Sequence, residues 1–257
     1  VLGGGGVILR VGHLYPEYLN IYADRGNIAV LERRAAARGH ELVIDPVTVG
    51  TPLEPRAQDL LYIGGGQDRE QAMVADDLAA RRGAVEAAVT GGSALLAVCG
   101  GYQLLGRGYR GRDGSWLAGV GLFPHETLAG DTRMIGDVLL ESALPEAPGR
   151  TIAGFENHAG RTLLDAGAEP LGRVVAGYGN DGESGFEGCR IGRALGTYLH
   201  GPLLPRNPWV ADLLLSWAIA HRTGAEPEPL APLDDSLERE AHAVAAARAR
   251  ARGGRPA

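Results

Sequence analysis

The sequence predicts an α/β protein with a central, mostly parallel sheet flanked by helices. Short apolar runs alternate with segments of helical periodicity, as strands joined by crossover helices do. Two of those runs lead into glycines, directly at 64–66 and after one residue at 100–101, where a strand would turn sharply. A chain of 257 residues that is 45% hydrophobic can also bury one sizeable core.

The first half of the chain supplies the alternation of strand and helix. We expect a strand at 7–11 and a helix at 27–38, in which Ile28, Leu31 and Ala35 lie near helical spacing and Gly39 acts as a stop. Largely apolar runs predict strands at 41–44, 59–63 and 94–98. Between the strands at 59–63 and 94–98 we expect a helix over 68–91 with a break near Gly83. After the strand at 94–98, residues 102–105 form a predicted helical segment.

The second half is richer in strands, which we expect at 134–140, 151–156, 173–176, 189–191 and 194–199. A helix at 207–221 closes a domain that spans 7–222. The remaining segment, 223–257, holds a proline-rich linker and an Ala/Arg-rich stretch at 236–252, for which we expect a helix or a disordered tail. No apolar run approaches the roughly 18 residues of a membrane helix.

Composition excludes several kinds of chemistry. All 25 basic residues are arginine, so the chain has no lysine for a Schiff base or for a phosphate-binding loop. A net charge of −6 disfavours nucleic acid as a partner. Two cysteines are too few for a disulfide framework or a cysteine-rich zinc site, and we expect no metal site and a reducing, cytoplasmic setting.

Cys99 is the most informative position. The apolar run 95–98 leads into this cysteine, and Gly100 and Gly101 follow it before a helical segment. A strained strand-to-helix turn needs such small neighbours, and the nearby helix N-terminus favours a thiolate. The alternative is a buried small hydrophobe, the usual fate of a free cysteine. The glycine pair favours a nucleophile, because packing alone does not require it. Cys189 lacks this context and is interpreted as structural.

A cysteine nucleophile needs a base, and His200 is the best candidate among seven histidines. It follows a predicted strand, so in a parallel sheet it would lie at the same edge as Cys99. His158 has a similar setting after 151–156 and is the competitor. The glycines at 64–66 also follow a strand, and their amides could complete an oxyanion hole, although a flexible turn is the simpler interpretation.

Taken together, these motifs resemble the class I, triad-type glutamine amidotransferases. The residues concerned are GGGQD at 64–68, AVCGGYQ at 97–103 and GTYLHGP at 196–202. The stretch GFENHAGRT at 154–162 is similar to the branch shared with cobyric acid synthase. The stretch LYPEYLNIYADRGN at 14–27 resembles the GatD family, the glutaminase subunits of lipid II isoglutaminyl synthases. The resemblance covers about 7–222 and implies a flavodoxin-like three-layer sandwich.

The resemblance implies a role for each matching catalytic residue. Cys99 would attack the side-chain amide of L-glutamine, releasing ammonia and leaving a glutamyl thioester. His200 would activate the thiol, protonate the leaving ammonia and later activate water. Backbone amides of Gly100, Gly65 and Gly66 would hold the oxyanion.

Two further residues match the family's substrate pocket. Arg133, in TRMIGD at 132–137, corresponds to a substrate-binding arginine that could pair with the glutamine α-carboxylate. Without the family context, an ion pair with Asp131 or Asp137 would be the simpler interpretation. Gln103 would also line the glutamine pocket.

One position departs from most triad amidotransferases, which carry a glutamate two residues after the histidine. Pro202 stands there and cannot orient an imidazole, a lack that the cobyric acid branch and the GatD family share. We expect either a carboxylate from a partner chain or a local one, such as Glu156, to fill that role.

The resemblance also implies a division of labour. The expected partner is a MurT-type ligase that binds ATP and Mg²⁺ and amidates the D-glutamate of lipid II to D-isoglutamine, with no cofactor on this chain. Because lipid II is the acceptor, the inner membrane face is the expected site of action. The alternatives are a glutaminase for cobyric or cobyrinic acid amidation, which would need a fused synthetase domain, and an inactive binding module that kept the fold.

Overall fold

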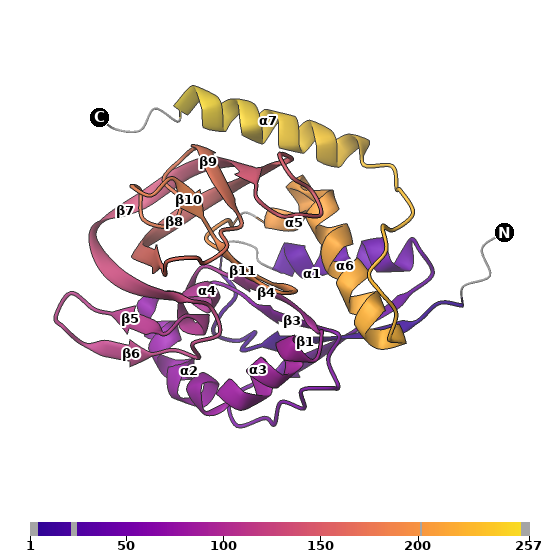
Figure 1. The fold of residues 1–257 in the computed structure, drawn as a ribbon, viewed down its shortest axis with the longest axis horizontal. Coiled ribbons are helices and arrows are strands. Elements are labelled where there is room, and N and C mark those ends of the chain that lie inside the picture. The colour runs from indigo at the N-terminus through magenta and orange to yellow at the C-terminus, as the bar shows by residue number, and fades with distance from the viewer. Residues whose placement is uncertain (1–4, 22–24, 201, 253–257) are drawn as a thin grey trace.

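The computed structural model describes residues 5–21, 25–200 and 202–252, and two six-stranded sheets organise them (Figure 1). Three parts of the predicted motifs lie outside these residues: 22–24, Gly201, and the C-terminal end at 253–257. The first sheet has the order β11-β12-β4-β3-β1-β2. Its strands are β1 (Ile8–Leu14), β2 (Glu41–Val47), β3 (Leu60–Ile63), β4 (Ala94–Val98), β11 (Cys189–Ile191) and β12 (Ala194–Thr197).

The first sheet is parallel except at one edge, where β11 runs antiparallel to β12. Its central strands β3 and β4 are buried along their whole length, which is why they read as unbroken apolar runs. The fold class predicted from the sequence is thereby confirmed, and β4 has the predicted bounds. β2 contains Pro46 and tolerates it because β2 is an edge strand.

Helices cover both faces of the first sheet (Figure 1). α1 (Arg25–Ala36) and α6 (Pro208–Thr223) pack together on one face, whereas α2 (Asp68–Ala80) and α3 (Arg82–Thr90) lie on the other. The short α4 (Gly100–Leu105) packs on β4 and β12 beside α2. The predicted helix break near Gly83 occurs at Arg81, which is both the C-cap residue of α2 and the N-cap residue of α3.

The second sheet was not predicted as a separate layer. It has the order β10-β9-β7-β5-β6, with β8 paired to β7. Its strands are β5 (Gly108–Arg110), β6 (Trp116–Ala118), β7 (His125–Ser142), β8 (Thr151–Leu164), β9 (Gly172–Ala176) and β10 (Phe186–Glu187). Sequence periodicity found only 134–140 of β7 and 151–156 of β8, and it missed β5, β6, β10 and the short helix α5 (Leu203–Arg206). Strands of two or three residues carry no period.

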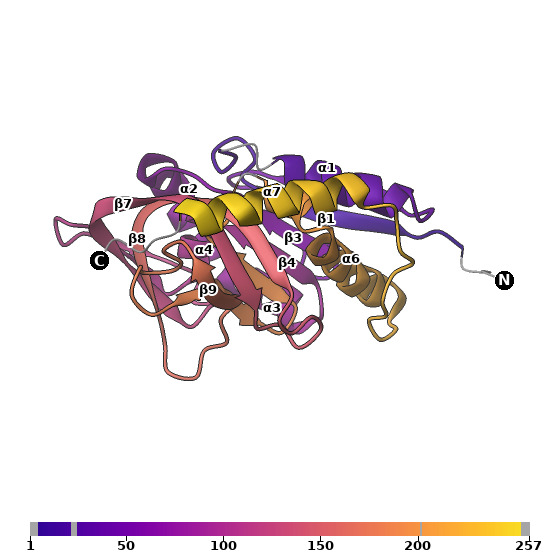
Figure 2. The same cartoon turned by 90° about the horizontal axis from the view of Figure 1, so that it is seen from above.

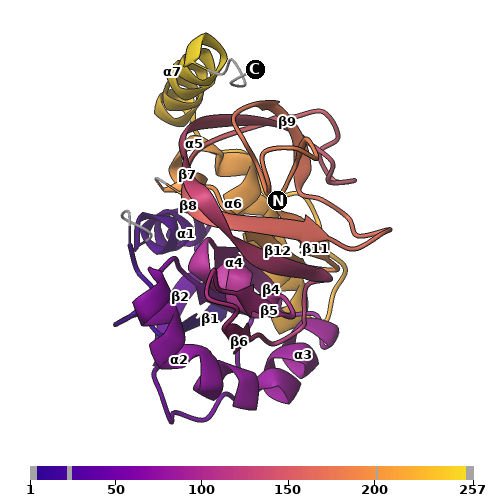
Figure 3. The same cartoon turned by 90° about the vertical axis from the view of Figure 1, so that its left-hand side faces the viewer.

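The two sheets meet at the carboxyl ends of β4 and β12 (Figure 3). His200 donates its amide to the carbonyl of Phe155 on β8 at 2.7 Å and accepts from the Phe155 amide at 3.3 Å. Deeper inside, the hydroxyls of Tyr198 and Thr162 lie 2.6 Å apart. The second sheet is therefore fixed to the edge of the first sheet where the candidate site residues were predicted.

The C-terminal helix α7 (Ser236–Arg252) lies across the second sheet (Figure 2). Its buried Ala245, Ala246 and Ala249 join a small apolar cluster with residues of β7, β8 and β9. Arg34 of α1, only 4% exposed, binds Asp212 of α6 and Asp235 just before α7. Across the described residues, none of the helices has the length and apolar character that crossing a bilayer demands.

Replacing Ala249 should detach α7 from the second sheet. Ala249→Glu places a charge at a fully buried position of the apolar cluster, and we expect it to destabilise the docked helix by about 2–4 kcal/mol. The matched control is Ala247→Glu, at an exposed position of the same helix. Limited trypsin digestion of the arginine-rich helix is the measurement, and equal cleavage of the two variants would contradict this packing.

Candidate active site

Cys99 lies in the turn that joins β4 to α4. Its backbone has φ +48° and ψ −106°. Among the other non-glycine residues that the structure describes, only Tyr15 also has a positive φ. Such a conformation is costly for a residue with a Cβ and persists where the surroundings enforce it. The Cys99 amide donates to the Thr197 carbonyl of β12 at 2.8 Å, and the residue is 5% exposed. The sulfur-bearing turn is thus strained, buried and tied to the neighbouring strand β12.

The two glycines after Cys99 are required by the close approach of a second loop. A Cβ on Gly100 would lie 2.9 Å from both the nitrogen and the oxygen of Gly66, and a Cβ on Gly101 would lie 2.8 Å from the Gly64 oxygen. The Gly101 amide donates to that same oxygen at 3.1 Å. The Gly64–Gly66 loop is therefore a packed partner of the cysteine turn and not a flexible connection.

Residues of the N-terminal motif support the Gly64–Gly66 loop from the opposite side. The Ile21 amide donates to the Gly65 carbonyl at 3.3 Å. A Cβ on Gly66 would lie 2.4 Å from the side chain of Leu19. The backbone of Gly65 and Gly66 is held between this segment and the cysteine turn, where its amides can face a developing oxyanion together with Gly100.

Gln103 connects this loop to the second sheet. Its side-chain oxygen accepts from Gln71 at 2.9 Å, and Gln71 also donates to the Gly66 carbonyl at 3.1 Å. The Gln103 amide nitrogen donates to the Tyr198 hydroxyl at 3.0 Å, and that hydroxyl lies 2.6 Å from the Thr162 hydroxyl on β8. Gln103 lines the cavity beside Cys99, and its amide also joins the two layers.

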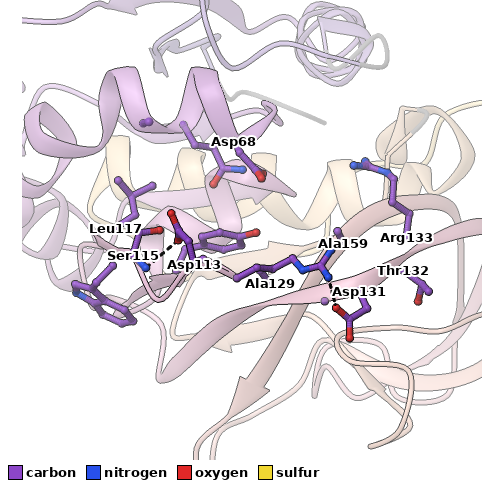
Figure 4. Close-up of a pocket in the computed structure, with 16 residues that line it drawn as sticks. Asp68, Asp113, Ser115, Leu117, Ala129, Asp131, Thr132, Arg133 and Ala159 are labelled. Atoms are coloured by element: carbon purple, nitrogen blue, oxygen red, sulfur yellow. Dashed lines mark hydrogen bonds and ion pairs between the residues drawn. The ribbon is translucent and has the colours of Figure 1, made fainter.

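A cavity of about 210 Å³ opens beside Cys99 and brings Arg133 into the site. Arg133 belongs to β7 and donates from Nε to the Asn157 side chain at 2.9 Å and from a terminal nitrogen to the Asn157 carbonyl at 3.1 Å. The simpler interpretation, a pair with Asp131 or Asp137, is wrong: those carboxylates bind Arg112 and Arg248. Arg133 also borders a larger outer hollow of about 760 Å³ (Figure 4).

The two candidate histidines occupy different places. His200 is fully buried three residues after β12, whereas His158 on β8 lines the cavity with Cys99. His158 is already engaged: Nδ1 lies 2.8 Å from the Gly160 carbonyl, Nε2 lies 3.7 Å from Glu156, and the ring stacks on Tyr198. Burial lowers the pKa of His158. The structure therefore places His158 in a packed aromatic layer next to the site.

Glu156, proposed from the sequence as a local orienting group, is fully buried on β8. Its carboxylate accepts from the amides of Tyr178 and Gly179 at 2.7 and 2.9 Å. Together with the nearby His158 imidazole, these contacts hold Glu156 within the second sheet.

Sequence reasoning missed Glu187, a buried carboxyl group beneath the chain that leads to His200. It accepts from the Tyr198 amide at 2.6 Å and from the Thr197 hydroxyl at 3.0 Å. Burial raises the pKa of Glu187 to about 8. Because β10 is only two residues long, no periodicity in the sequence could indicate that this glutamate faces inward.

The fold and the cysteine turn define a class of protein, the glutamine amidotransferases. The chain belongs to the family of the CobB/CobQ-like glutamine amidotransferase domain, whose model matches residues 10–208. Two solved structures share the fold: one titled as PurLQS from Thermotoga maritima, with a TM-score of 0.55, 17% identity, and coverage of 75% of this chain and 87% of that one; and a glutamine amidotransferase with a TM-score of 0.54, 18% identity, and coverage of 81% and 98%.

Within that family the chain belongs with the GatD subunits of the glutamine-hydrolysing lipid II isoglutaminyl synthases. It is 39% identical to the Staphylococcus aureus GatD subunit over 92% of this chain and 94% of that protein. It is 37% identical to the Streptococcus pneumoniae GatD subunit over 90% and 88%. A cobyric acid synthase from Pelotomaculum thermopropionicum is 31% identical over 81% of this chain but only 40% of its own length.

The contact between the two glycine turns yields one prediction. Gly100→Ala should lower the rate of glutamine hydrolysis by at least about 100-fold, because the new Cβ must displace the Gly66 backbone that lines the oxyanion site. The control is Gly83→Ala in α3, where the new Cβ meets nothing within 4 Å. This variant should stabilise the helix slightly and leave the rate of glutamine hydrolysis unchanged. Steady-state ammonia release measures both, and a fully active Gly100→Ala variant would contradict the contact.

The burial of Glu187 yields a second prediction. Folding raises the pKa of Glu187, so between about pH 5 and 8 its carboxyl group is ionised in the unfolded chain and protonated in the folded protein. The free energy of unfolding therefore falls as the pH rises through this range. Glu187→Gln removes this decrease, so its free energy of unfolding should gain on the wild type by at most about 1.4 kcal/mol per pH unit over that range. Urea denaturation at pH 5, 6.5 and 8 measures the difference, and a gap that shrinks with rising pH would show that Glu187 is ionised in the folded protein.

Proposed function

We propose that this chain hydrolyses L-glutamine at Cys99 and delivers the ammonia to a MurT-type ligase, which amidates the D-glutamate of lipid II to D-isoglutamine. The observation that carries the proposal is the strained, glycine-flanked Cys99 beside a cavity that also contains Arg133. A thiol at such a turn suits attack on a carbonyl carbon, and a guanidinium in the same cavity suits a carboxylate.

The hydrolysis proceeds in two acyl-transfer steps. The Cys99 sulfur attacks the side-chain amide carbon of glutamine, and amides of Gly100 and the Gly65–Gly66 loop stabilise the negative oxygen. His200 takes the thiol proton and gives it to the departing nitrogen, so that ammonia leaves and a glutamyl thioester remains. His200 then takes a proton from water, the hydroxide attacks the thioester carbon, and the proton returns to the sulfur as glutamate departs.

His200 is assigned as the base for two reasons. It follows β12, which pairs in parallel with β4, the strand that ends at Cys99. His158, its competitor, donates from Nδ1 to the Gly160 carbonyl, faces Glu156 and stacks on Tyr198. These contacts suit a residue that supports the pocket wall.

The energy-coupled half of the reaction is assigned to a second subunit. Both GatD relatives are named as subunits of lipid II isoglutaminyl synthase. This chain has no lysine to hold phosphate groups, so ATP and Mg²⁺ belong to the ligase in this proposal. The cobyric acid alternative is disfavoured because the chain is 31% identical to the cobyric acid synthase relative and 37–39% identical to the two GatD subunits.

The partner is also the better source of a group that orients His200. Glu156 is committed to the Tyr178 and Gly179 amides and lies beside His158. We therefore assign the orienting carboxylate to the ligase subunit, which would couple glutamine hydrolysis to the presence of the acceptor enzyme.

Substitution of the three candidate groups tests this mechanism. Cys99→Ala should abolish glutamine-dependent amidation while free ammonia still supports it, because the ligase step needs only ammonia. His200→Gln should lower kcat for glutamine hydrolysis by about 10²–10⁴-fold, whereas His158→Gln should lower it by less than about tenfold. Ammonia release and lipid II amidation by the chain in complex with its ligase are the measurements, with Cys189→Ala as the control for loss of a buried thiol.

Three results would contradict the proposal. Glutamine-dependent amidation by Cys99→Ala would remove the nucleophile. A larger loss in His158→Gln than in His200→Gln would reverse the assignment of the base. Equal rates of glutamine hydrolysis by the free chain and by the complex would exclude a carboxylate supplied by the partner.

A further inference from the structure

The cavity beside Cys99 has charges of both signs around its rim. Among the described residues that line it, Arg69 and Arg133 carry guanidinium groups and Asp68 carries the one carboxylate. Asp68 and Arg133 both line the outer hollow as well, so they stand where the small cavity opens. The charged pair that lines both cavities, one cation and one anion, matches a zwitterion, the form in which a free amino acid exists at neutral pH.

Asp68 and Arg133 reach the opening from different layers of the protein. Asp68 is the first residue of α2, four residues beyond the start of the Gly64–Gly66 loop, whereas Arg133 belongs to β7 of the second sheet. Figure 4 shows Asp68 on the helix at one side of the hollow and Arg133 on the strand at a different side. The phenol of Tyr109 lies near both: burial raises its pKa most, Asp68 raises it further and Arg133 opposes the rise.

The other carboxylates around the outer hollow are already engaged. Asp131 pairs with Arg112 at 2.6 Å, and Asp113 accepts from the Ser115 amide at 2.9 Å. Asp68 makes no side-chain hydrogen bond or ion pair with another residue of the described part of the chain, and it is exposed. A carboxylate at the N-terminus of α2 gains from the helix dipole, but that gain does not account for its position at the opening of the cavity.

We propose that Asp68 binds the α-ammonium group of glutamine while Arg133 binds its α-carboxylate. The inference rests on the proposed function, since it places the glutamine side-chain amide at Cys99. It makes Asp68 a specificity-determining residue: the site takes a free amino acid, and it rejects a glutamine whose nitrogen is acylated, as in a peptide, because acylation removes the positive charge and leaves Asp68 facing an uncharged amide.

The test compares two ligands that differ only in the α-amino group. L-Glutamine carries it, and glutaramate, the same five-carbon acid amide without it, does not. In Asp68→Asn, the KM for L-glutamine should rise about tenfold or more, because one charge-assisted contact is lost. The Ki of glutaramate as a competitor should change less than about twofold. Asp68→Glu, which keeps the charge, should restore part of the affinity for L-glutamine.

The matched control is Asp76→Asn, which removes the same charge from an exposed position of α2 outside both cavities. It should leave both constants unchanged. A parallel rise of the KM and the Ki in Asp68→Asn would overturn the inference, because a merely structural or general electrostatic role weakens both ligands alike. No change in either constant would also overturn it.

Failure of this inference is distinguishable from failure of the proposed function. If the wild-type complex hydrolyses glutamine and Cys99→Ala does not, the proposed function stands whatever Asp68→Asn does. Calorimetry on the Cys99→Ala chain measures binding without hydrolysis. If this chain binds L-glutamine more tightly than glutaramate, and Asp68→Asn removes that difference in affinity, then Asp68 binds the ammonium group even where no hydrolysis is observed.

Discussion

The packing of one glycine turn against another holds the candidate nucleophile in a conformation that it would not adopt alone. The turn after β4 and the loop after β3 approach so closely that Gly100 and Gly101 have no room for a Cβ. This contact keeps Cys99 at φ +48° and brings the Gly66 backbone next to the turn. Because β3 and β4 are neighbouring parallel strands, the sheet itself sets the distance between the two turns.

The second sheet supplies what the parallel sheet lacks. Arg133 and His158 reach the cavity from β7 and β8, and a chain of buried hydrogen bonds through Gln103 and Tyr198 connects that sheet to the loop at Gly66. A buried polar network of this kind is stable only when its members are satisfied, so it fixes the two layers relative to each other. The candidate site therefore forms where the two sheets meet, and both sheets contribute residues to it.

The sequence predicted those features that are local or periodic. β4 and the Cys99 turn could be placed because an apolar run, a cysteine and two glycines are adjacent, and Arg133 was found through a motif that the family shares. The buried position of Glu187 could not be predicted, since it depends on contacts with Thr197 and Tyr198, which lie on a different strand and just after it. The second sheet escaped prediction because β5, β6 and β10 have three residues or fewer and because β7 shifts its register between Ala129 and Met134, which breaks the alternation.

The most direct test of Cys99 as the nucleophile is covalent trapping with 6-diazo-5-oxo-L-norleucine, a glutamine analogue that alkylates an attacking thiol. The protein in complex with its ligase is treated with the analogue, and the modified peptide is mapped by mass spectrometry. The account predicts a single adduct on Cys99, formed at a rate that L-glutamine reduces by competition. An unmodified Cys99, or an adduct on the buried Cys189 in its place, would contradict it.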